Sequence, residues 1–419
     1  MSMRISQSSP DALLTKEQKR SNFCSLLIAG GIVTNHRTYR VGIAGSYGGL
    51  NMGDEAILKC IISELRQSLS VEITVFSRNP NDTLQRHRVE RAFAVREMTR
   101  GEACREMNGL DLFIFGGGGI LFEAEAEIYL REVQLANEMG IPVMVYAVSA
   151  GPLKTRGAQK LVREALNQAK IITVRERGAK RTLENAGVEK EIIVTVDPAF
   201  CMKPEPLEDD RLLRDGLDES AVLVGMSVRE PGPAAPDIDH DVYHGLLADA
   251  ADFIIDRYEA HVVFMPMERG MRDMQHSHAV VSKMLRPQHA TVLKGDYSPG
   301  QLLYIMGKFT FAVGMRLHFL IFAALQGIPF VALPYSEKVQ GLLQDLEIEF
   351  PPMNLVNAGR LIAHIDHNWD HREQLRAHID HRLPGLRERA KENNRLLVEL
   401  MGRLPEQTNG EGLTKNCRI

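Results

Sequence analysis

The sequence has few cysteines, a single tryptophan and no long apolar run. Its five cysteines are widely spaced and odd in number, so they fit neither a disulfide framework nor a zinc-binding pattern. No apolar stretch approaches the ~20 residues that a membrane-spanning helix needs. We therefore predict no transmembrane segment, with at most peripheral membrane association, and a place in the reducing cytoplasm.

A strong charge of either sign is also missing. The 50 lysines and arginines nearly balance the 54 acidic residues, and the formal net charge is −4. Without a basic field, a nucleic-acid partner is disfavoured. Apolar residues at 44% and charged residues at 25% are typical of a globular protein, and 419 residues exceed what one core usually supports. We therefore expect two domains.

From residue 40 onward, short apolar runs alternate with helical patterns, which is typical of parallel sheets covered by helices. The expected strands of the first half are 41–44, 71–76, 112–115, 143–148, 171–174 and 192–196. The expected helices between them are 54–68, 123–138, 157–168 and 177–185. A second series of expected strands follows at 222–228, 262–265, 291–293, 310–313 and 330–333.

This alternation predicts an α/β protein with two tandem Rossmann-like, doubly wound domains that face each other across a cleft. The predicted divisions are a partly disordered N-terminal extension (1–39), an N-terminal domain (40–202), a linker (203–220), a C-terminal domain (221–356), and C-terminal helices with a polar tail (357–419). Pro384-Gly385 is expected to break the last stretch into two helices.

Two glycine-rich segments follow expected strands of the first domain. The first, residues 45–53, has neither dinucleotide-binding spacing nor a P-loop lysine. Its Asn51 and Asp54 either cap the next helix or bind a sugar hydroxyl, and Gly53 lies between them. The second is a turn of four glycines, 116–119, where either a ligand approaches Gly117 and Gly118 or helix and sheet pack tightly.

Four cationic or titratable residues are expected at the carboxyl edges of the two sheets. Arg175 follows the strand 171–174, Arg316 and His318 open a helix, and Lys338 opens the next one. The apolar neighbourhood of Arg316 offers no evident anionic partner, so a bound anion would supply one. The four residues together suit a small polyanion. The simpler alternatives are a solvated arginine, a core histidine and a surface lysine.

Two other features have simpler interpretations. Asp197-Pro198, at a strand end, is read chiefly as a turn former. His364, His367 and His371 share one helical face, a spacing that suits a transition metal, but acidic and basic neighbours favour a solvated charged face. We predict no metal site.

Five motifs, in their order along the chain, resemble those of one known family. They are the segment 51–58, GGGG with Leu121-Phe122 behind it, VRE at 174–176, GMRLH at 314–318 and YSEKVQG at 335–341. By these motifs, which span about residues 40–346, the chain resembles the polysaccharide pyruvyl transferases. It departs from them in its N-terminal extension and its histidine-rich tail.

The resemblance implies a GT-B-like fold, phosphoenolpyruvate as donor, and a sugar of a cell-surface glycan or its lipid-linked precursor as acceptor. The product would be a cyclic pyruvate ketal, with phosphate released. It implies functional roles for Arg175, His318 and Lys338. Asn51 and Asp54 match the family's polar first loop.

The expected chemistry agrees with these residue types. Arg175, Arg316 and Lys338 would clamp the phosphate and carboxylate of the donor, so no metal or other cofactor is required. His318 would protonate the donor's methylene carbon. Asp54, or His318 after it has given up its proton, would deprotonate the acceptor hydroxyls, and the sequence leaves this choice open.

Two other functions remain open at this stage. One is a nucleotide-sugar glycosyltransferase of similar two-domain shape, although no acidic ribose-binding residue is evident in the second domain. The other is a non-catalytic module that binds a glycan or an anion.

Overall fold

The computed structural model describes residues 37–123, 125–208, 211–230, 239–268, 272–333, 337–349 and 357–404. The described residues from Thr38 onward form one compact unit. The predicted extension 1–39 and the end of the predicted tail therefore lie mostly outside the described residues. Among the described helices, none is both long and apolar enough to cross a membrane.

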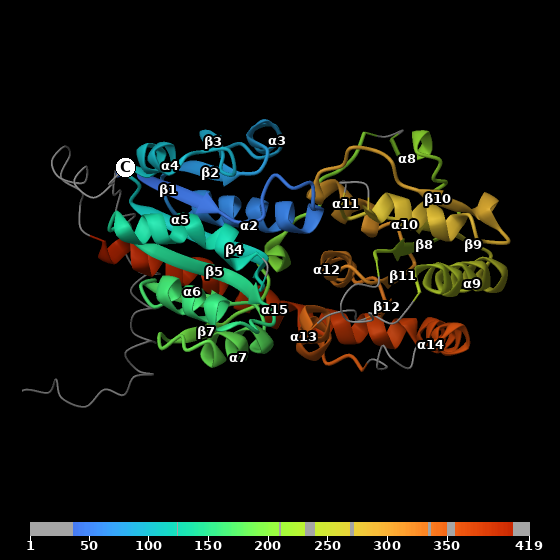
Figure 1. The fold of residues 1–419 in the computed structure, drawn as a ribbon. Helices are drawn as coiled ribbons and strands as arrows, with labels where there is room; N and C mark the ends of the chain where they lie inside the picture. Colours follow the sequence, from blue (N-terminus) through green and yellow to red (C-terminus); the bar gives the residue numbers. More distant parts are fainter. Residues whose placement is uncertain are drawn as a thin grey trace, which may run out of the picture. The chain divides into compact units, whose positions relative to one another are not determined.

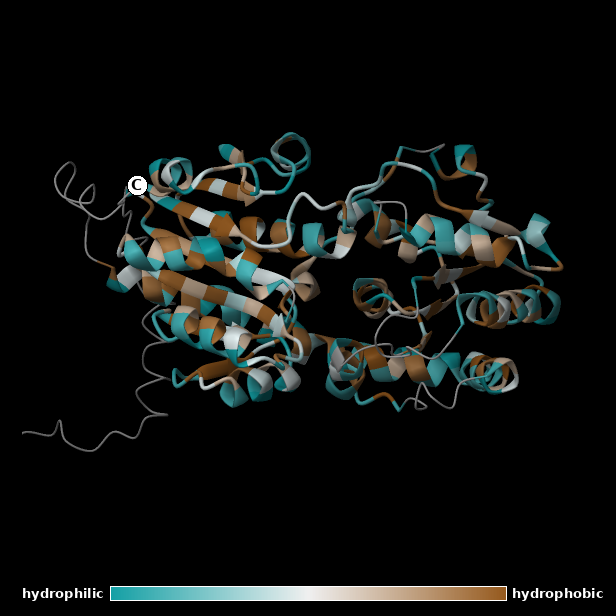
Figure 2. Cartoon of the chain, viewed as in Figure 1, coloured by the Kyte–Doolittle hydropathy of each residue, from teal (hydrophilic) through white to brown (hydrophobic). Residues whose placement is uncertain are grey.

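Parallel strands form the first sheet, in the order β3-β2-β1-β4-β5-β6-β7 (Figure 1). The strands are β1 (Tyr39–Ala44), β2 (Val71–Ser77), β3 (Arg91–Ala94), β4 (Leu112–Leu121), β5 (Val143–Ala150), β6 (Ile171–Val174) and β7 (Ile192–Val194). Figure 2 shows that the central strands of this sheet are largely hydrophobic. Strands buried on both faces are apolar throughout, which explains why all but the short β3 were predicted.

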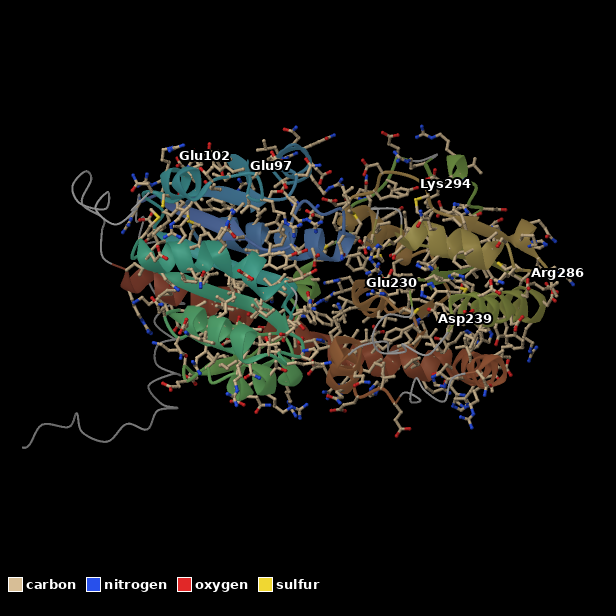
Figure 3. All side chains as sticks on the ribbon, in the orientation of Figure 1. Glu97, Glu102, Glu230, Asp239, Arg286 and Lys294 are labelled. Carbon is tan, nitrogen blue, oxygen red and sulfur yellow. The ribbon has the colours of Figure 1, made fainter. Side chains whose placement is uncertain are left out.

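Helices connect these strands and, with the sheet, make up what we call the N-terminal lobe. They are α2 (Met52–Ser68), α3 (Pro80–Arg86), α4 (Arg100–Met107), α5 (Ala126–Glu138), α6 (Arg156–Leu166) and α7 (Arg177–Asn185). The predicted helices are confirmed, whereas α3 and α4 were missed. Both short helices carry start signals: Asn79 caps α3, and Thr99 and Glu102 form a capping box on α4, with Glu102 labelled in Figure 3.

The glycine run 116–119 differs from its prediction as a turn. It continues β4, which extends to Leu121 and pairs with β5. The pairing shifts register between Gly119 and Leu121, and Gly117 and Gly118 have φ angles of 76° and 89°. Positive φ angles favour glycine, so the backbone conformation explains why Gly117 and Gly118 are glycines.

The second sheet is also parallel, with the order β10-β9-β8-β11-β12. Its strands are β8 (Val222–Ser227), β9 (Ala260–Phe264), β10 (Ala290–Val292), β11 (Phe311–Gly314) and β12 (Phe330–Ala332). Its helices are α9 (His240–Tyr258), α10 (Arg272–Val281), α11 (Pro299–Met306), α12 (Leu317–Leu325) and α13 (Glu337–Leu346). We call this part the C-terminal lobe. The short α8 (Arg211–Arg214) lies within the predicted linker.

Two helices end the described chain, α14 (Ala358–Asp370) and α15 (Arg372–Arg403). The predicted break at Pro384 is wrong, because α15 continues through it. Leu383 and Leu386 are buried in the core of the C-terminal lobe, so packing outweighs the hydrogen bond that proline removes. Near its end, α15 buries Leu397 in a core of the N-terminal lobe. One helix thus packs against both lobes.

The cysteines agree only in part with the expectation that they form no disulfide framework. Cys60 and Cys201 are free, and Cys60 is buried. Cys104 is disulfide-bonded, and its partner lies outside the described residues.

Asn393 fastens α15 to the N-terminal lobe. It is fully buried, its side-chain oxygen accepts hydrogen bonds from the hydroxyls of Thr173 (2.7 Å) and Thr195 (2.9 Å), and its amide donates to the carbonyl of Val196. We expect Asn393→Ala to lower the free energy of unfolding by about 2–4 kcal/mol, because it leaves several buried polar groups unpaired. Denaturant unfolding measures this change. The exposed Asn185 provides the control, and an equal effect of Asn185→Ala would contradict the assignment.

Candidate functional site

The carboxyl ends of strands from both sheets bring most of the predicted residues to one cavity. Arg175 follows β6, His318 lies in the first turn of α12 after β11, and Lys338 lies on α13 after β12. The cavity is about 40 Å³ in volume, enough for a few water molecules. Its lining residues are Asn51, Asp54, Gly119, Arg175, Met267, Arg316, Leu317, His318 and Lys338.

Asp197 joins the two lobes at this cavity. Its Oδ2 lies 2.6 Å from Nη1 of Arg175 and 3.3 Å from Nε2 of His318. The second contact is an ion pair without hydrogen-bond geometry. All three side chains are buried, with at most 9% of each residue exposed. The carboxylate therefore holds the guanidinium of the N-terminal lobe and the imidazole of the C-terminal lobe in one cluster.

The electrostatics of Asp197 explain its ionisation. Burial alone would raise the pKa of this carboxyl, but the positive charges of His318 and Arg175 outweigh burial and hold the pKa well below its usual range. Its Oδ1 also accepts a hydrogen bond from the N–H of Ala199 (2.9 Å). Asp197 was predicted chiefly as a turn former, so its place at this site was missed, although it follows a strand at the same sheet edge.

Glu176 contributes a second carboxylate beside Arg175. Its Oε2 lies 3.3 Å from Nε of Arg175, and its Oε1 accepts a hydrogen bond from Ser149. Burial raises the pKa of Glu176, and the charge of Arg175 opposes that rise. Arg175 is therefore a buried and doubly paired arginine, not the solvated residue of the simpler interpretation.

Two glycines, Gly53 on α2 and Gly118 on β4, leave space for the side chains of His318 and Asp54. A Cβ on Gly53 would lie 1.9 Å from Nδ1 of His318, and one on Gly118 would lie 2.8 Å from Oδ1 of Asp54. The imidazole of the C-terminal lobe thus lies directly against the backbone of the N-terminal lobe. Burial raises the pKa of Asp54, and the charges of His318 and Lys338 oppose the rise. Asp54 is consequently a stronger base than an exposed aspartate when it is ionised.

The other glycines divide between packing and the cavity. Gly117 faces Ile57 and the hydroxyl of Tyr47, which favours the packing alternative for this position. Gly119 was not among the predicted site residues, but it lines the cavity, and a Cβ there would lie 3.8 Å from Nζ of Lys338.

Asn51 has a structural role and also lines the cavity. Its side chain caps α2 by accepting a hydrogen bond from Gly53 N–H (3.0 Å), and its backbone forms an antiparallel bridge with Glu268 of the C-terminal lobe. Met52 N–H donates to the carbonyl of Met267 (2.7 Å). Backbone hydrogen bonds therefore join the two lobes beside the cavity.

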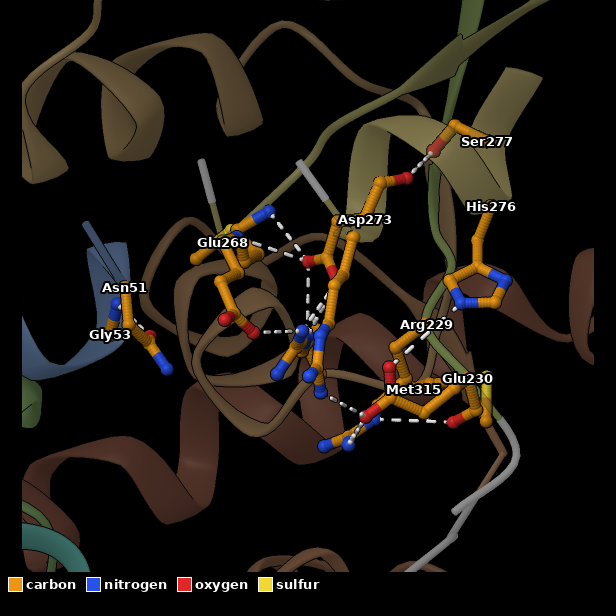
Figure 4. A network of polar contacts seen from close by, with 12 residues as sticks. Asn51, Gly53, Arg229, Glu230, Glu268, Asp273, His276, Ser277 and Met315 are labelled. Atoms are coloured by element: carbon orange, nitrogen blue, oxygen red, sulfur yellow. Dashed lines mark hydrogen bonds and ion pairs between the residues drawn. The ribbon is translucent and has the colours of Figure 1, made fainter. Parts of the chain in front are cut away.

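The prediction that Arg316 lacks an anionic partner is wrong. Its guanidinium is paired with Asp273, with Nε 3.0 Å from Oδ2, and with Glu268 Oε2 at 2.7 Å from Nη2. Figure 4 shows both acidic residues on the same network, together with Asn51 and Gly53 of the other lobe. The apolar sequence around Arg316 concealed this pairing, because both carboxylates come from elsewhere in the chain. Arg316 is thus charge-compensated without a ligand.

The histidines of the C-terminal helices lie apart from this cavity. The rings of His367 and His371 are tilted against each other with centroids 4.3 Å apart, and His378 is hydrogen-bonded to the carbonyl of Leu346. Among the residues that the structure describes, no group of three or more histidine, cysteine or acidic side chains is arranged to hold a metal.

The sequence of this chain matches one family of known proteins. The sequence model of the family described as polysaccharide pyruvyl transferase matches residues 51–337, which contain every residue that lines the cavity except Lys338. The chain belongs to this family. It is therefore an enzyme of the transferase class, and its family indicates pyruvyl transfer to a glycan. No match was found among curated proteins.

Solved structures support the fold. A putative UDP-N-acetylglucosamine 2-epimerase from Listeria monocytogenes shares 11% identity, with a TM-score of 0.60 over 90% of this chain and 99% of that one. A glycosyltransferase from Rickettsia africae shares 10% identity, with a TM-score of 0.59 over 88% and 99%. These likenesses confirm the two-domain, Rossmann-like GT-B fold.

The first test of the site concerns the charge of Asp197. Its pKa is lower in the folded chain than the unfolded value of about 3.9, so its ionised form stabilises the fold above that pH and the contribution fades as the pH falls below it. We expect Asp197→Asn to lose about 3 kcal/mol of unfolding free energy at pH 7, because the buried guanidinium of Arg175 loses the ion pair with Asp197. We also expect its stability to fall less than that of the wild type between about pH 5 and 2.

Denaturant unfolding across that pH range checks both expectations. Asp256, which pairs with Arg286 at the surface, provides the control, and Asp256→Asn should lose less than about 1 kcal/mol. Parallel stability curves for the wild type and Asp197→Asn would contradict the assigned ionisation.

A second test concerns the approach of His318 to Gly53. A methyl group at this position overlaps the imidazole, so we expect Gly53→Ala to displace the ring and to lower stability by about 1–3 kcal/mol. The ring resonances of His318 in NMR spectra, together with thermal unfolding, measure the two effects.

Gly157 provides a matched control, because it also lies in the first turn of a helix and a Cβ there meets its nearest atom at 3.9 Å. Gly157→Ala should leave His318 unmoved and stability equal or slightly higher. Unchanged His318 resonances in Gly53→Ala would refute the close contact.

Proposed function

We propose that this enzyme transfers the pyruvyl group of phosphoenolpyruvate to two hydroxyls of a sugar, in a cell-surface polysaccharide or its lipid-linked precursor. The product is a cyclic ketal, and phosphate is released. The observation that carries the proposal is the cluster in which Asp197 holds Arg175 of one lobe and His318 of the other at one cavity, with Lys338 on its wall.

Donor binding would rest on Lys338, His318 and the remaining donors of Arg175. Phosphoenolpyruvate carries a phosphate and a carboxylate, which these cationic groups bind with charge-assisted hydrogen bonds. Arg316 is already neutralised by Asp273 and Glu268, so we assign it a smaller share of donor binding than the sequence suggested.

In the proposed reaction His318 acts as the acid. The imidazolium gives a proton to the methylene carbon, and the first sugar hydroxyl adds to the carbon that carries the phosphate. The second hydroxyl then replaces the phosphate on that carbon. In the overall balance, one hydroxyl proton ends on the new methyl group and the other leaves with phosphate. Asp54 or the neutral His318 would accept the hydroxyl protons.

Positive charge for the departing phosphate would come from arginine and lysine, so the proposal assigns no role to a metal or other cofactor. We place the reaction in the cytoplasm, since phosphoenolpyruvate is a metabolite of that compartment. The alternative donor is a nucleotide sugar, because one structural neighbour is an epimerase bound to UDP-GlcNAc. Thermal-shift titration separates the two, because the true donor raises the melting temperature.

We expect His318→Gln to fold normally and to slow phosphate release from phosphoenolpyruvate in the presence of acceptor by at least ~100-fold, since the acid is lost. Phosphate assays and mass spectrometry of the pyruvylated glycan measure the effect. The exposed His278 gives a matched control, and His278→Gln should keep full activity. Full activity of His318→Gln would refute its role.

Arg175 needs a variant that keeps its charge, because Arg175→Ala would leave Asp197 and Glu176 buried beside each other. We expect Arg175→Lys to remain folded and to lose at least ~10-fold in kcat/KM for the donor, because lysine lacks the planar fork of arginine. Steady-state kinetics with varied phosphoenolpyruvate measure this loss. Wild-type kinetics in the folded variant would contradict a role in donor binding.

A further inference from the structure

A second and larger cavity lies in the N-terminal lobe. Its volume is about 510 Å³, compared with about 40 Å³ for the cavity at His318. It lies where β1, β2 and β3 end, against α5. The residues on its wall that bear on a ligand are Arg78, Arg96, Glu127, Tyr129, Arg131 and Glu132. This volume is in the range of small-molecule sites.

The charges on this wall favour an anion. Among the described residues, Arg78 and Arg96 form no ion pair, and the guanidinium of Arg96 lies over the ring of Tyr129, 5.9 Å from its centroid. Arg131 is occupied by Glu132, with Nε 2.6 Å from Oε1. Glu127 is the other carboxylate on the wall. The cavity is therefore lined by two arginines without an ion pair among the described residues and by Glu127.

One loop connects the two cavities. In residues 45–51, Gly45 lines the larger cavity and Asn51 lines the one at His318. Between them, Ser46 accepts a hydrogen bond from the hydroxyl of Tyr129 (3.2 Å), and a Cβ on Gly49 would lie 2.5 Å from Nη1 of Arg78. The loop is thus held to the wall of the larger cavity at one end and reaches the reaction site at the other.

We propose that the larger cavity binds an oxyanion attached to the acceptor saccharide, with Arg78 and Arg96 as its ligands. This inference rests on the proposed function, because it assigns the cavity to the acceptor. Arginine binds phosphate and carboxylate groups through paired N–H donors, so a sugar phosphate and a uronic acid share the required chemistry. Most of a saccharide would occupy the cavity while the reacting sugar extends along residues 45–51 to His318.

The test measures binding of defined probes to the full chain by calorimetry. The probes are glucose, galactose and N-acetylglucosamine, their 1-phosphates, glucuronic and galacturonic acid, and inorganic phosphate. We expect at least one phosphorylated or carboxylated sugar to bind at least ~10-fold more tightly than its neutral parent. The two arms of the panel distinguish a phosphate from a carboxylate.

The double variant Arg78→Ala/Arg96→Ala should lose this preference, while Arg181→Ala should keep it. Arg181 is exposed and contributes to neither cavity, so it controls for the loss of positive charge alone. The proposal is overturned if no charged sugar binds better than its parent, if the double variant binds as the wild type does, or if inorganic phosphate binds as tightly as the sugar phosphates.

The variant His318→Gln separates this inference from the proposed function. It should keep the preference for the charged sugar, because His318 lines the other cavity. Binding that depends on Arg78 and Arg96 without any pyruvylated product would refute the proposed reaction and leave the cavity assignment standing. Pyruvyl transfer with an unchanged acceptor KM in the double variant would refute the cavity assignment alone.

Discussion

The ion pairs of Asp197 with Arg175 and His318 are the interaction on which the site depends. Arg175 belongs to the lobe of the first sheet and His318 to the lobe of the second, and the carboxylate of Asp197 lies within ion-pair distance of both side chains. A buried guanidinium such as that of Arg175 is costly unless a carboxylate is paired with it. The carboxylate lets both cationic groups occupy one cavity, where either lobe alone would present half of the arrangement.

Close approach of the lobes depends on missing side chains as much as on charge. Gly53 admits the imidazole of His318, and Met52 donates a backbone hydrogen bond to Met267 beside it. Helix α15 secures the same arrangement from another direction, since it is buried in the cores of both lobes and is fastened by Asn393. Backbone contacts, ion pairs and a shared helix therefore act on the same interface.

The sequence predicts some parts of this molecule well for physical reasons. Buried parallel strands must be apolar, so nearly all strands were identified, and their carboxyl ends placed Arg175, His318 and Lys338 correctly at one cavity. Partners distant in sequence were not predictable. Glu268 and Asp273 neutralise Arg316, and Asp197 acquires its role only when two lobes meet. Helix α15 shows the same limit, because tertiary packing overrides the local signal of Pro384.

The balance of charge explains how a site rich in cations can exist before its substrate arrives. Arg175 and Arg316 each have two carboxylate partners, so the buried cavity is not an uncompensated cluster of positive charge. Uncompensated positive charge alone would therefore not bind a polyanion there. A polyanion would have to be recognised by the geometry of the side chains that line the cavity, Lys338 and His318 among them. Such a site favours a ligand with two separate anionic groups over a simple ion, since a single phosphate would satisfy fewer of the donors that two lobes present.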